Sequence, residues 1–285
     1  SQKVLFEWHS LDHIDPSESY EPRPTAAGAQ YDYLHVNSID VDSDGNLLVS
    51  ARHTWAVYKL DRHSGAVLWR LGGKRSDFAM GAGTAFAWQH DARRQADGTV
   101  TLFDDNAAPN GSRGIVLDLD AARMAATLVR AYTHPGGIQS TSQGNVQILP
   151  DGDALVGWGS QPNVSEFDRR GRLVFDAALP PGSSSYRAFR FPWVGQPTEA
   201  PAIALDLGEP GTLTAYVSWN GVTEVQSWEL LGGGTATTLV PMASTPRTGF
   251  ETAIAIPKRP AFVAARAHDL LGMTLGTTPV IATQL

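Results

Sequence analysis

A tight-turn dipeptide recurs three times in the first half of the chain at an almost constant interval. Asp44-Gly45, Asp97-Gly98 and Asp151-Gly152 lie about 53 residues apart, each between runs rich in Val, Leu, Thr and aromatic residues. An Asp-Gly pair favours the turn of a β-hairpin, and a repeat of this length is typical of arrays built from one supersecondary unit. No convincing helical period longer than two turns interrupts these runs before about residue 180. The sequence therefore predicts a repeated antiparallel β-unit.

Each repeat contains four strand-length runs, which is the number of strands in one blade of a β-propeller. We predict strands at 36–41, 47–51, 56–60 and 66–71, at 91–94, 99–103, 114–119 and 127–132, and at 145–149, 154–157, 163–167 and 173–178. Three blades cannot close a ring, since a propeller has about four to eight. We therefore expect two or three further blades in an N-terminal portion, on a separate polypeptide or cut off from this chain, with the run 4–8 as an outer strand of the blade before the first repeat.

A second domain is expected after the repeats. The composition becomes that of a linker at Pro180-Pro181-Gly182, and the repeat is lost after Phe191-Pro192-Trp193. Short alternating runs then follow at 202–205, 212–219, 227–231, 237–241, 252–256 and 261–267. Their spacing is typical of an immunoglobulin or fibronectin type III β-sandwich. We predict an all-β protein with a partial β-propeller at 1–190 and a small β-sandwich at 191–285, and because the second region carries few titratable clusters, we expect catalysis in the first.

Charge and composition exclude several classes of protein. The chain has 22 Lys and Arg against 29 Asp and Glu, a formal net charge of −7 with no basic run, and no cysteine. Binding to a phosphate backbone depends on clustered positive charge, so nucleic acid is not an expected partner. No apolar stretch approaches the roughly 18 residues of a membrane span. Disulfides, cysteine-ligated zinc and thiol catalysis are excluded.

Alignment of the repeats on their Asp-Gly turns gathers polar residues at one position. His35, His90 and Gln143 fall just before or at the first strand of each repeat, the strand that lines the central channel of a propeller. The second strand of each repeat runs antiparallel to the first, so it ends at the same mouth of the channel at which the first begins. We therefore expect one polar pocket there, built from His35, Asn37, Arg52, His90, Asp104, Asp105, Gln143 and Trp158.

Several of these residues have a structural interpretation that stays open. A histidine at the start of an inner strand often bonds a neighbouring backbone, although two in register facing Arg52 favour function. By strand alternation, His53 is expected to point away from Arg52. Asp104 and Asp105 are expected to stabilise a turn or to orient a neighbour, since one short loop offers too few oxygens for Ca²⁺. Trp88 is expected in the core between blades. Two histidines without a third ligand are too few for a metal site, so no bound metal is predicted.

Two imidazoles and a guanidinium suit one kind of chemistry. Imidazole is a nucleophile near neutral pH, and a guanidinium with a second imidazolium stabilises a tetrahedral oxyanion group. Sulfuryl or phosphoryl transfer fits this set. Neither a Walker-type loop nor a Rossmann glycine fingerprint occurs, so no nucleotide cofactor is predicted.

The ordered segments also resemble a known family. Residues 33–39 (YLHVNSI), 48–53 (LVSARH), 88–92 (WQHDA) and 102–106 (LFDDN), with 4–10 and 144–147, look like the PAPS-independent arylsulfate sulfotransferase (ASST) family over about residues 1–190. The resemblance implies a six-bladed propeller when complete, phenolic sulfate donors, phenol acceptors, a sulfohistidine intermediate and an extracytoplasmic or secreted location. By motif match, His90 is the nucleophile, His35 and Arg52 hold the sulfate, and Asn37 assists. A further sulfate-binding histidine of the family lies upstream of this chain.

Three functions follow from this pocket. The first is an arylsulfate sulfotransferase. The second is a non-catalytic protein, made of a β-propeller and a β-sandwich, that binds sulfated or anionic ligands at a cell surface. The third is an arylsulfate hydrolase that uses water as the acceptor.

Overall fold

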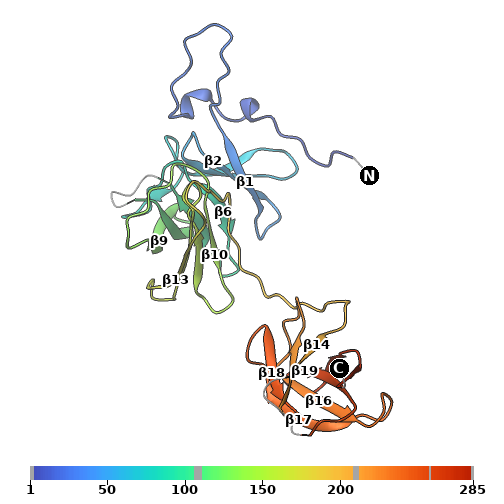
Figure 1. Ribbon diagram of the computed structural model, residues 1–285. Coiled ribbons are helices and arrows are strands. Elements are labelled where there is room, and N and C mark those ends of the chain that lie inside the picture. The colour runs from blue at the N-terminus through green and yellow to red at the C-terminus, as the bar shows by residue number, and fades with distance from the viewer. Residues whose placement is uncertain (1–2, 106–110, 208–211, 257, 284–285) are drawn as a thin grey trace. The chain divides into compact units, whose positions relative to one another are not determined.

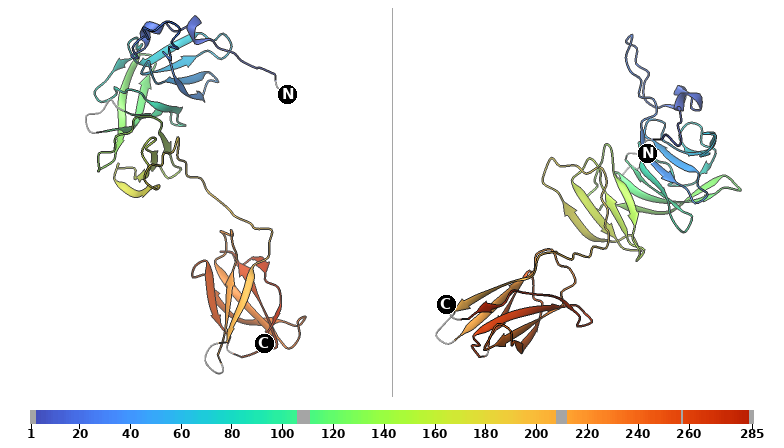
Figure 2. Two further views of the ribbon diagram at one scale, coloured as in Figure 1. Left: turned by 45° about the horizontal axis from the view of Figure 1, so that its top comes forward. Right: turned by 90° about the vertical axis from the view of Figure 1, so that its right-hand side faces the viewer.

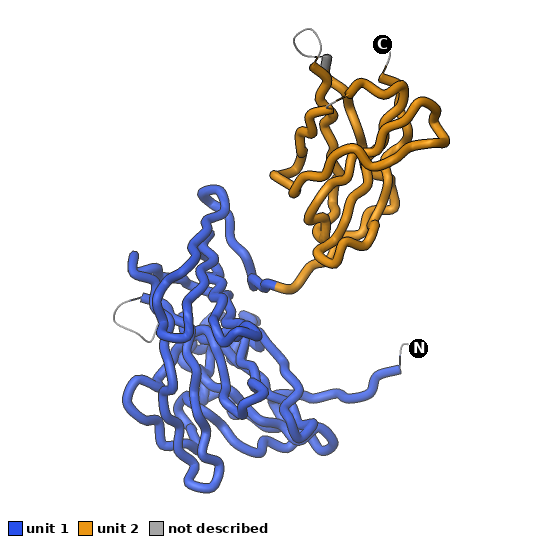
Figure 3. The backbone as a smooth tube through the Cα atoms, turned by 90° about the horizontal axis from the view of Figure 1, so that it is seen from below, with its two compact units in different colours: residues 1–190 blue, residues 191–285 orange. Residues whose placement is uncertain are grey.

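The computed structural model describes residues 3–105, 111–207, 212–256 and 258–283. It divides into two compact units, Ser1–Arg190 and Phe191–Leu285 (Figure 3). Regular structure in the described residues is almost entirely β, apart from two short 3-10 helices, η1 (Ser10–Asp12) and η2 (Pro16–Glu18). None of the described helices has the length and apolar character needed to cross a membrane. The prediction of an all-β protein is confirmed.

The first unit contains three sheets, each with four antiparallel strands that pair in chain order (Figures 1 and 2). Sheet 1 consists of β1 (Val36–Val41), β2 (Leu47–Ala51), β3 (Ala56–Leu60) and β4 (Val67–Gly72). Sheet 2 consists of β6 (His90–Arg94), β7 (Val100–Asp104), β8 (Arg113–Asp120) and β9 (Ala125–Thr133), with β5 (Ala79–Met80) parallel to β9. Sheet 3 consists of β10 (Asn145–Ile148), β11 (Ala154–Gly157), β12 (Asn163–Phe167) and β13 (Leu173–Ala178). The predicted strand bounds hold to within two residues.

The three Asp-Gly turns share one geometry, which explains the repeat signal. In each turn the aspartate side chain accepts the backbone N–H two residues later, at 3.0 or 3.1 Å. The glycines have φ between 83° and 89°, a left-handed conformation that a Cβ atom disfavours. Each turn therefore closes a hairpin at the same point of its sheet.

Sheet 2 is buried on both faces by its neighbours. Leu48 and Leu71 of sheet 1 pack with Ile115 of sheet 2, and Val116 of sheet 2 packs with Val156 of sheet 3. Full burial of one such side chain stabilises the fold by about 1.5–3 kcal/mol. Sheet 2 is thus a rigid support for the residues at the ends of its strands.

The prediction of a strand at 4–8 is wrong. These residues form no strand, and Val4 and Leu5 are 70% and 84% exposed. A strand needs a neighbour for its N–H and C=O groups, and no described strand pairs with this run. Trp8 is fixed in another way, because its indole N–H donates to the Gly65 carbonyl at 3.0 Å.

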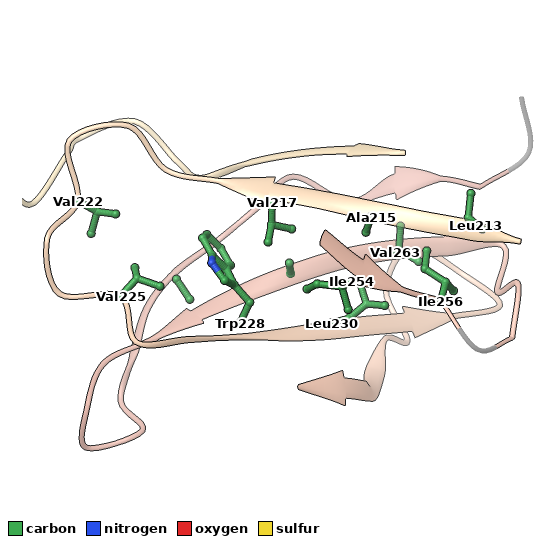
Figure 4. Close-up of a cluster of buried hydrophobic side chains, with 12 residues drawn as sticks. Leu213, Ala215, Val217, Val222, Val225, Trp228, Leu230, Ile254, Ile256 and Val263 are labelled. Carbon is green, nitrogen blue, oxygen red and sulfur yellow. The ribbon is translucent and has the colours of Figure 1, made fainter. Parts of the chain in front are cut away.

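The second unit consists of two antiparallel sheets around one core. One sheet has the order β14 (Ala202–Leu207), β15 (Leu213–Ser218), β18 (Glu251–Ala255). The other has the order β17 (Val240–Pro246), β16 (Ser227–Gly233), β19 (Phe262–His268), β20 (Thr274–Thr277), with β21 (Ile281–Ala282) also beside β19. Val217 and Trp228 point toward one another in the buried layer (Figure 4). β20 and β21 were not predicted, because they are too short to show a period.

Candidate active site

His90 and Asp105 lie side by side at one edge of sheet 2. His90 begins β6 and Asp105 directly follows β7, and the antiparallel register, in which His90 faces Phe103, brings them together. His90 Nδ1 is 2.7 Å from Asp105 Oδ2 and 2.9 Å from the Trp88 carbonyl oxygen. His90 is 2% exposed and Asp105 is fully buried.

A backbone group just before sheet 3 fixes the tautomer of His90. The N–H of Gln143, which has φ of 69°, donates to His90 Nε2 at 3.1 Å. A nitrogen that accepts carries no proton, so the ring proton of neutral His90 is on Nδ1, where it is donated to Asp105. The basic lone pair of the imidazole is therefore on Nε2.

Burial dominates the ionisation of Asp105. It raises the pKa of this carboxyl to about 6, although the hydrogen bond from His90 and the positive charge of Arg52 both act to lower it. A carboxyl with this pKa is ionised at neutral pH, so Asp105 is then a negatively charged acceptor for the Nδ1 proton of His90.

Arg52 connects the edges of all three sheets. It follows β2, its guanidinium donates to the Thr141 carbonyl before β10 at 3.0 Å, and its Cζ is 5.6 Å from the centroid of the Trp88 ring before β6. The guanidinium also lies 2.9 Å from His53 Nε2. Arg52 therefore supplies a fixed positive charge near Asp105 and His90.

His53 lies against Arg52, contrary to the prediction from strand alternation. It was expected to point away from Arg52, but it is buried, contacts the Arg52 guanidinium, and lies with its ring centroid 4.7 Å from that of His35. Alternation between faces applies only within a strand. Because β2 ends at Ala51 and residues 52–55 form a turn, successive side chains no longer alternate.

His35 is held by an aspartate that the sequence analysis missed. His35, with φ of 52°, contacts the Asp32 carboxylate through Nδ1. One donor atom from each of Asp32, His35 and His53 lies within 4.8 Å of the others, a spacing that a metal ion could bridge. The adjacent Arg52 guanidinium disfavours a cation there. We assign the cluster to hydrogen bonding that fixes His35 and Arg52.

The structure does not gather three of the expected residues around His90. Asn37 donates to the Gln89 carbonyl at 2.8 Å and joins sheets 1 and 2. Asp104 accepts from Arg113 Nε at 2.9 Å, on the opposite side of β7 from Asp105. Trp158 is fully buried in the core between sheets 2 and 3. These three residues stabilise the sheets and do not line the site. Asn106, the last residue of the family-like segment 102–106, lies outside the described residues.

A segment after the linker also reaches this edge. The Tyr186 and His90 ring centroids are 6.2 Å apart, with the rings nearly perpendicular. Arg187 donates to the Asn37 carbonyl at 2.9 Å, and its Nε is 2.8 Å from the buried Asp91 carboxylate. No local pattern predicts these contacts, because they join residues about 100 to 150 positions apart.

Comparison with known proteins gives distant structural similarities and one family. The chain is 13% identical to hydrazine synthase of Kuenenia stuttgartiensis, with a TM-score of 0.37 and coverage of 92% of this chain and 53% of that chain, so it spans about half that length. It is 16% identical to the PQQ-bound aldose sugar dehydrogenase of Streptomyces coelicolor (TM-score 0.34, 79% and 70% covered). It is 11% identical to virginiamycin B lyase of Staphylococcus aureus (TM-score 0.36, 90% and 86% covered). No curated protein matches the chain in sequence.

The family comparison is specific to the part of the chain that carries the His90 site. The model of the family described as arylsulfotransferase (ASST) matches residues 1–179, which is more than half of the chain and includes all three sheets of the first unit. The chain belongs to the arylsulfotransferase (ASST) family.

Proposed function

We propose that the protein is an arylsulfate sulfotransferase that moves a sulfuryl group from a phenolic sulfate ester to a phenol through a sulfohistidine. One observation carries the proposal. In a chain of the arylsulfotransferase family, His90 has its Nδ1 proton directed to Asp105 and its Nε2 lone pair directed away from it, at the edge where Arg52 also lies.

Two displacements at sulfur make up the reaction. The His90 Nε2 lone pair gives up the hydrogen bond from the Gln143 N–H and forms the N–S bond while the bond from sulfur to the aryl oxygen breaks, and the aryl group leaves as phenolate. The oxygen of an acceptor phenol then attacks sulfur, the N–S bond breaks, and the phenolic proton is released to solvent. During the first step the ring becomes positively charged, and Asp105 stabilises that charge through the Nδ1 proton.

The surrounding groups suit the charge that develops on the sulfuryl oxygens. Arg52 and His35 would hold these oxygens, and the Gln143 N–H, once released from Nε2, is close enough to donate to one of them. Asp32 and His53 keep His35 and Arg52 oriented. An arylsulfate carries a good leaving group, so positioning and charge contribute more than acid catalysis.

We also propose that further blades complete the ring, six in all, on a separate polypeptide or an upstream part of the same protein. Three sheets are too few for closure. Apolar side chains remain exposed on β1, at Ile39 and Val41, and on β13, at Val174 and Phe175, where further blades would cover them. The family's upstream sulfate-binding histidine would then complete the pocket.

The second unit is proposed as a fibronectin type III-like sandwich at 191–285, following propeller blades at 1–190. Its three-stranded sheet joins the first, second and fifth strands, and its larger sheet joins the fourth, third, sixth and seventh, an order that supports this assignment. By family analogy we propose an extracytoplasmic location.

Intact-protein mass spectrometry tests the proposed function. The purified protein is mixed with 4-nitrophenyl sulfate, and we expect a gain of one SO₃ that maps to His90 and is lost when a phenol is added. His90→Ala should form no adduct, while His63→Ala, which alters a histidine in an exposed turn, should label normally. Binding without an adduct or product would select the non-catalytic binding protein, and release of nitrophenol without sulfation of an added phenol would select the hydrolase.

A further inference from the structure

An aromatic pocket lies next to the site and shares Trp88 with it, since the Trp88 ring lines the pocket and contacts the Arg52 guanidinium. Its volume is about 410 Å³, and it is lined by Tyr20, Trp55, Gly72, Gly73, Phe86 and Trp88, among others. Trp55 lies in the turn between β2 and β3, Gly72 ends β4, and Trp88 precedes β6. These are the same strand ends that position Arg52 and His90, so the pocket and the site share one edge of the first unit.

Two aromatic walls meet at a right angle in this pocket. The rings of Tyr20 and Trp55 stack with their centroids 3.7 Å apart and an interplanar angle of 9°, which leaves no room for a ligand ring between them. Trp88 meets Trp55 edge to face, at 5.7 Å and 83°. A flat aromatic ligand placed in this corner would stack on one wall and present its edge to the other, the two arrangements that aromatic pairs prefer.

The floor of the pocket requires glycine. A Cβ at Gly72 would lie 2.6 Å from Phe86 Cζ, and one at Gly73 would lie 2.5 Å from the Thr54 carbonyl oxygen. Both residues also have positive φ, 78° and 72°. Close packing of the chain beneath the aromatic walls thus keeps the pocket in shape.

Arg52 joins the pocket to the catalytic groups. Its guanidinium lies over the Trp88 ring, 5.6 Å from the centroid, and its charge also acts on Asp105. Trp88 connects the two places as well, because its ring lines the pocket and its carbonyl oxygen lies 2.9 Å from His90 Nδ1. A ligand with a ring in the corner would carry its anionic substituent at the guanidinium.

We propose that this pocket is the subsite that holds the aryl ring, first of the sulfate ester and then of the phenol acceptor, and that it accepts ring systems of two fused rings. This inference rests on the proposed function. The volume lies in the range of pockets for drug-sized ligands and exceeds what a single phenyl ring fills. The Trp55 indole N–H is buried and has no partner within the described part of the chain, so it can donate to an oxygen on the ring.

Binding of a neutral ring tests the pocket separately from sulfuryl transfer. We would titrate 2-naphthol and phenol into the whole protein by calorimetry, with and without inorganic sulfate. We expect 2-naphthol to bind more tightly than phenol, and sulfate not to displace it. Tyr20→Ala, which removes the outer wall, should weaken 2-naphthol binding about three- to tenfold. Tyr20→Phe keeps the stack and should bind as wild type.

Controls separate this inference from a folding defect and from the proposed function. Tyr216→Ala alters a tyrosine of the second unit and should not change the affinity for 2-naphthol. Unchanged affinity in Tyr20→Ala, or no binding of 2-naphthol by the wild type, would overturn the pocket assignment even if a sulfohistidine forms. The expected binding pattern without any sulfohistidine would leave the pocket assignment standing and refute the proposed function.

Discussion

The Asp105 carboxylate lies 2.7 Å from Nδ1 of His90, and both side chains are almost completely removed from solvent. A buried carboxylate beside an imidazole fixes the ring and stabilises positive charge on it. In the proposed reaction that charge appears when Nε2 bonds to sulfur. Asp105 is therefore a positioning residue whose contribution should be largest in the step that forms the sulfohistidine.

Replacement of Asp105 by Asn should lower kcat with little change in stability. The variant removes a charge-assisted hydrogen bond, which contributes about 1.5–3 kcal/mol, so kcat with 4-nitrophenyl sulfate should fall roughly 10- to 100-fold. Stopped-flow release of nitrophenol measures the first step directly. Asp118→Asn, at an exposed position on β8, is the matched control. A wild-type rate in Asp105→Asn would contradict the role given to this carboxylate.

The pH dependence of the rate should follow the ionisation of the same pair. Burial raises the pKa of Asp105 to about 6, so kcat/KM should fall as the pH drops through about 6 and the carboxylate is protonated. The pH dependence of folding stability has the opposite sign to that of the rate. Because the folded protein holds this proton up to a higher pH than the unfolded chain does, the group's contribution to stability decreases as the pH rises from 3.8 to about 6. Rate profiles of wild type and Asp105→Asn that coincide would refute this assignment.

His53 should act through Arg52 on binding of the sulfate group. His53→Ala removes the nitrogen that lies 2.9 Å from the guanidinium, and we expect KM for 4-nitrophenyl sulfate to rise about tenfold with a smaller change in kcat. His53→Gln retains an acceptor and should recover most of the affinity. Steady-state kinetics of both variants check this, and equal defects in the two would indicate a packing role only.

Asp42 should stabilise the first unit through its buried ion pairs with Arg94 and Lys59. Burial by itself would raise its pKa, but hydrogen bonds from Arg94 and Lys59 outweigh burial and hold the pKa well below its usual range. Asp42→Asn breaks this buried pairing and should lower the free energy of unfolding by about 3 kcal/mol. Asp44 contacts the same lysine, at 2.7 Å, but is half exposed, so Asp44→Asn should cost less than about 1 kcal/mol.

Urea unfolding of the two variants measures this difference as a shift of the midpoint at constant slope. The depressed pKa also fixes the sign of the pH effect. The contribution of Asp42 is present at neutral pH and is lost as the pH falls below the ordinary carboxyl value of 3.8. Similar losses for Asp42→Asn and Asp44→Asn would show that burial does not strengthen the first pairing.

The strand pattern of the chain could be read from the sequence because it is a local property. The apolar runs and the Asp-Gly turns that close the hairpins depend on residues a few positions apart, and the structure reproduces the strands predicted within 36–178. The ordered motifs around His35, Arg52 and His90 likewise pointed to the arylsulfotransferase family, and the family match confirms it.

Only the tertiary structure decided which side chains meet. Alternation ends where a strand ends, so the placement of His53 beside Arg52 could not be inferred from β2. The contacts of Tyr186 and Arg187 with His90 and Asn37 join segments that are distant in sequence. The run at 4–8 has strand composition but no described partner strand, and it stays irregular. The sequence sets local backbone preference, whereas long-range packing and hydrogen-bond partners determine which of those preferences are realised and which residues share a site.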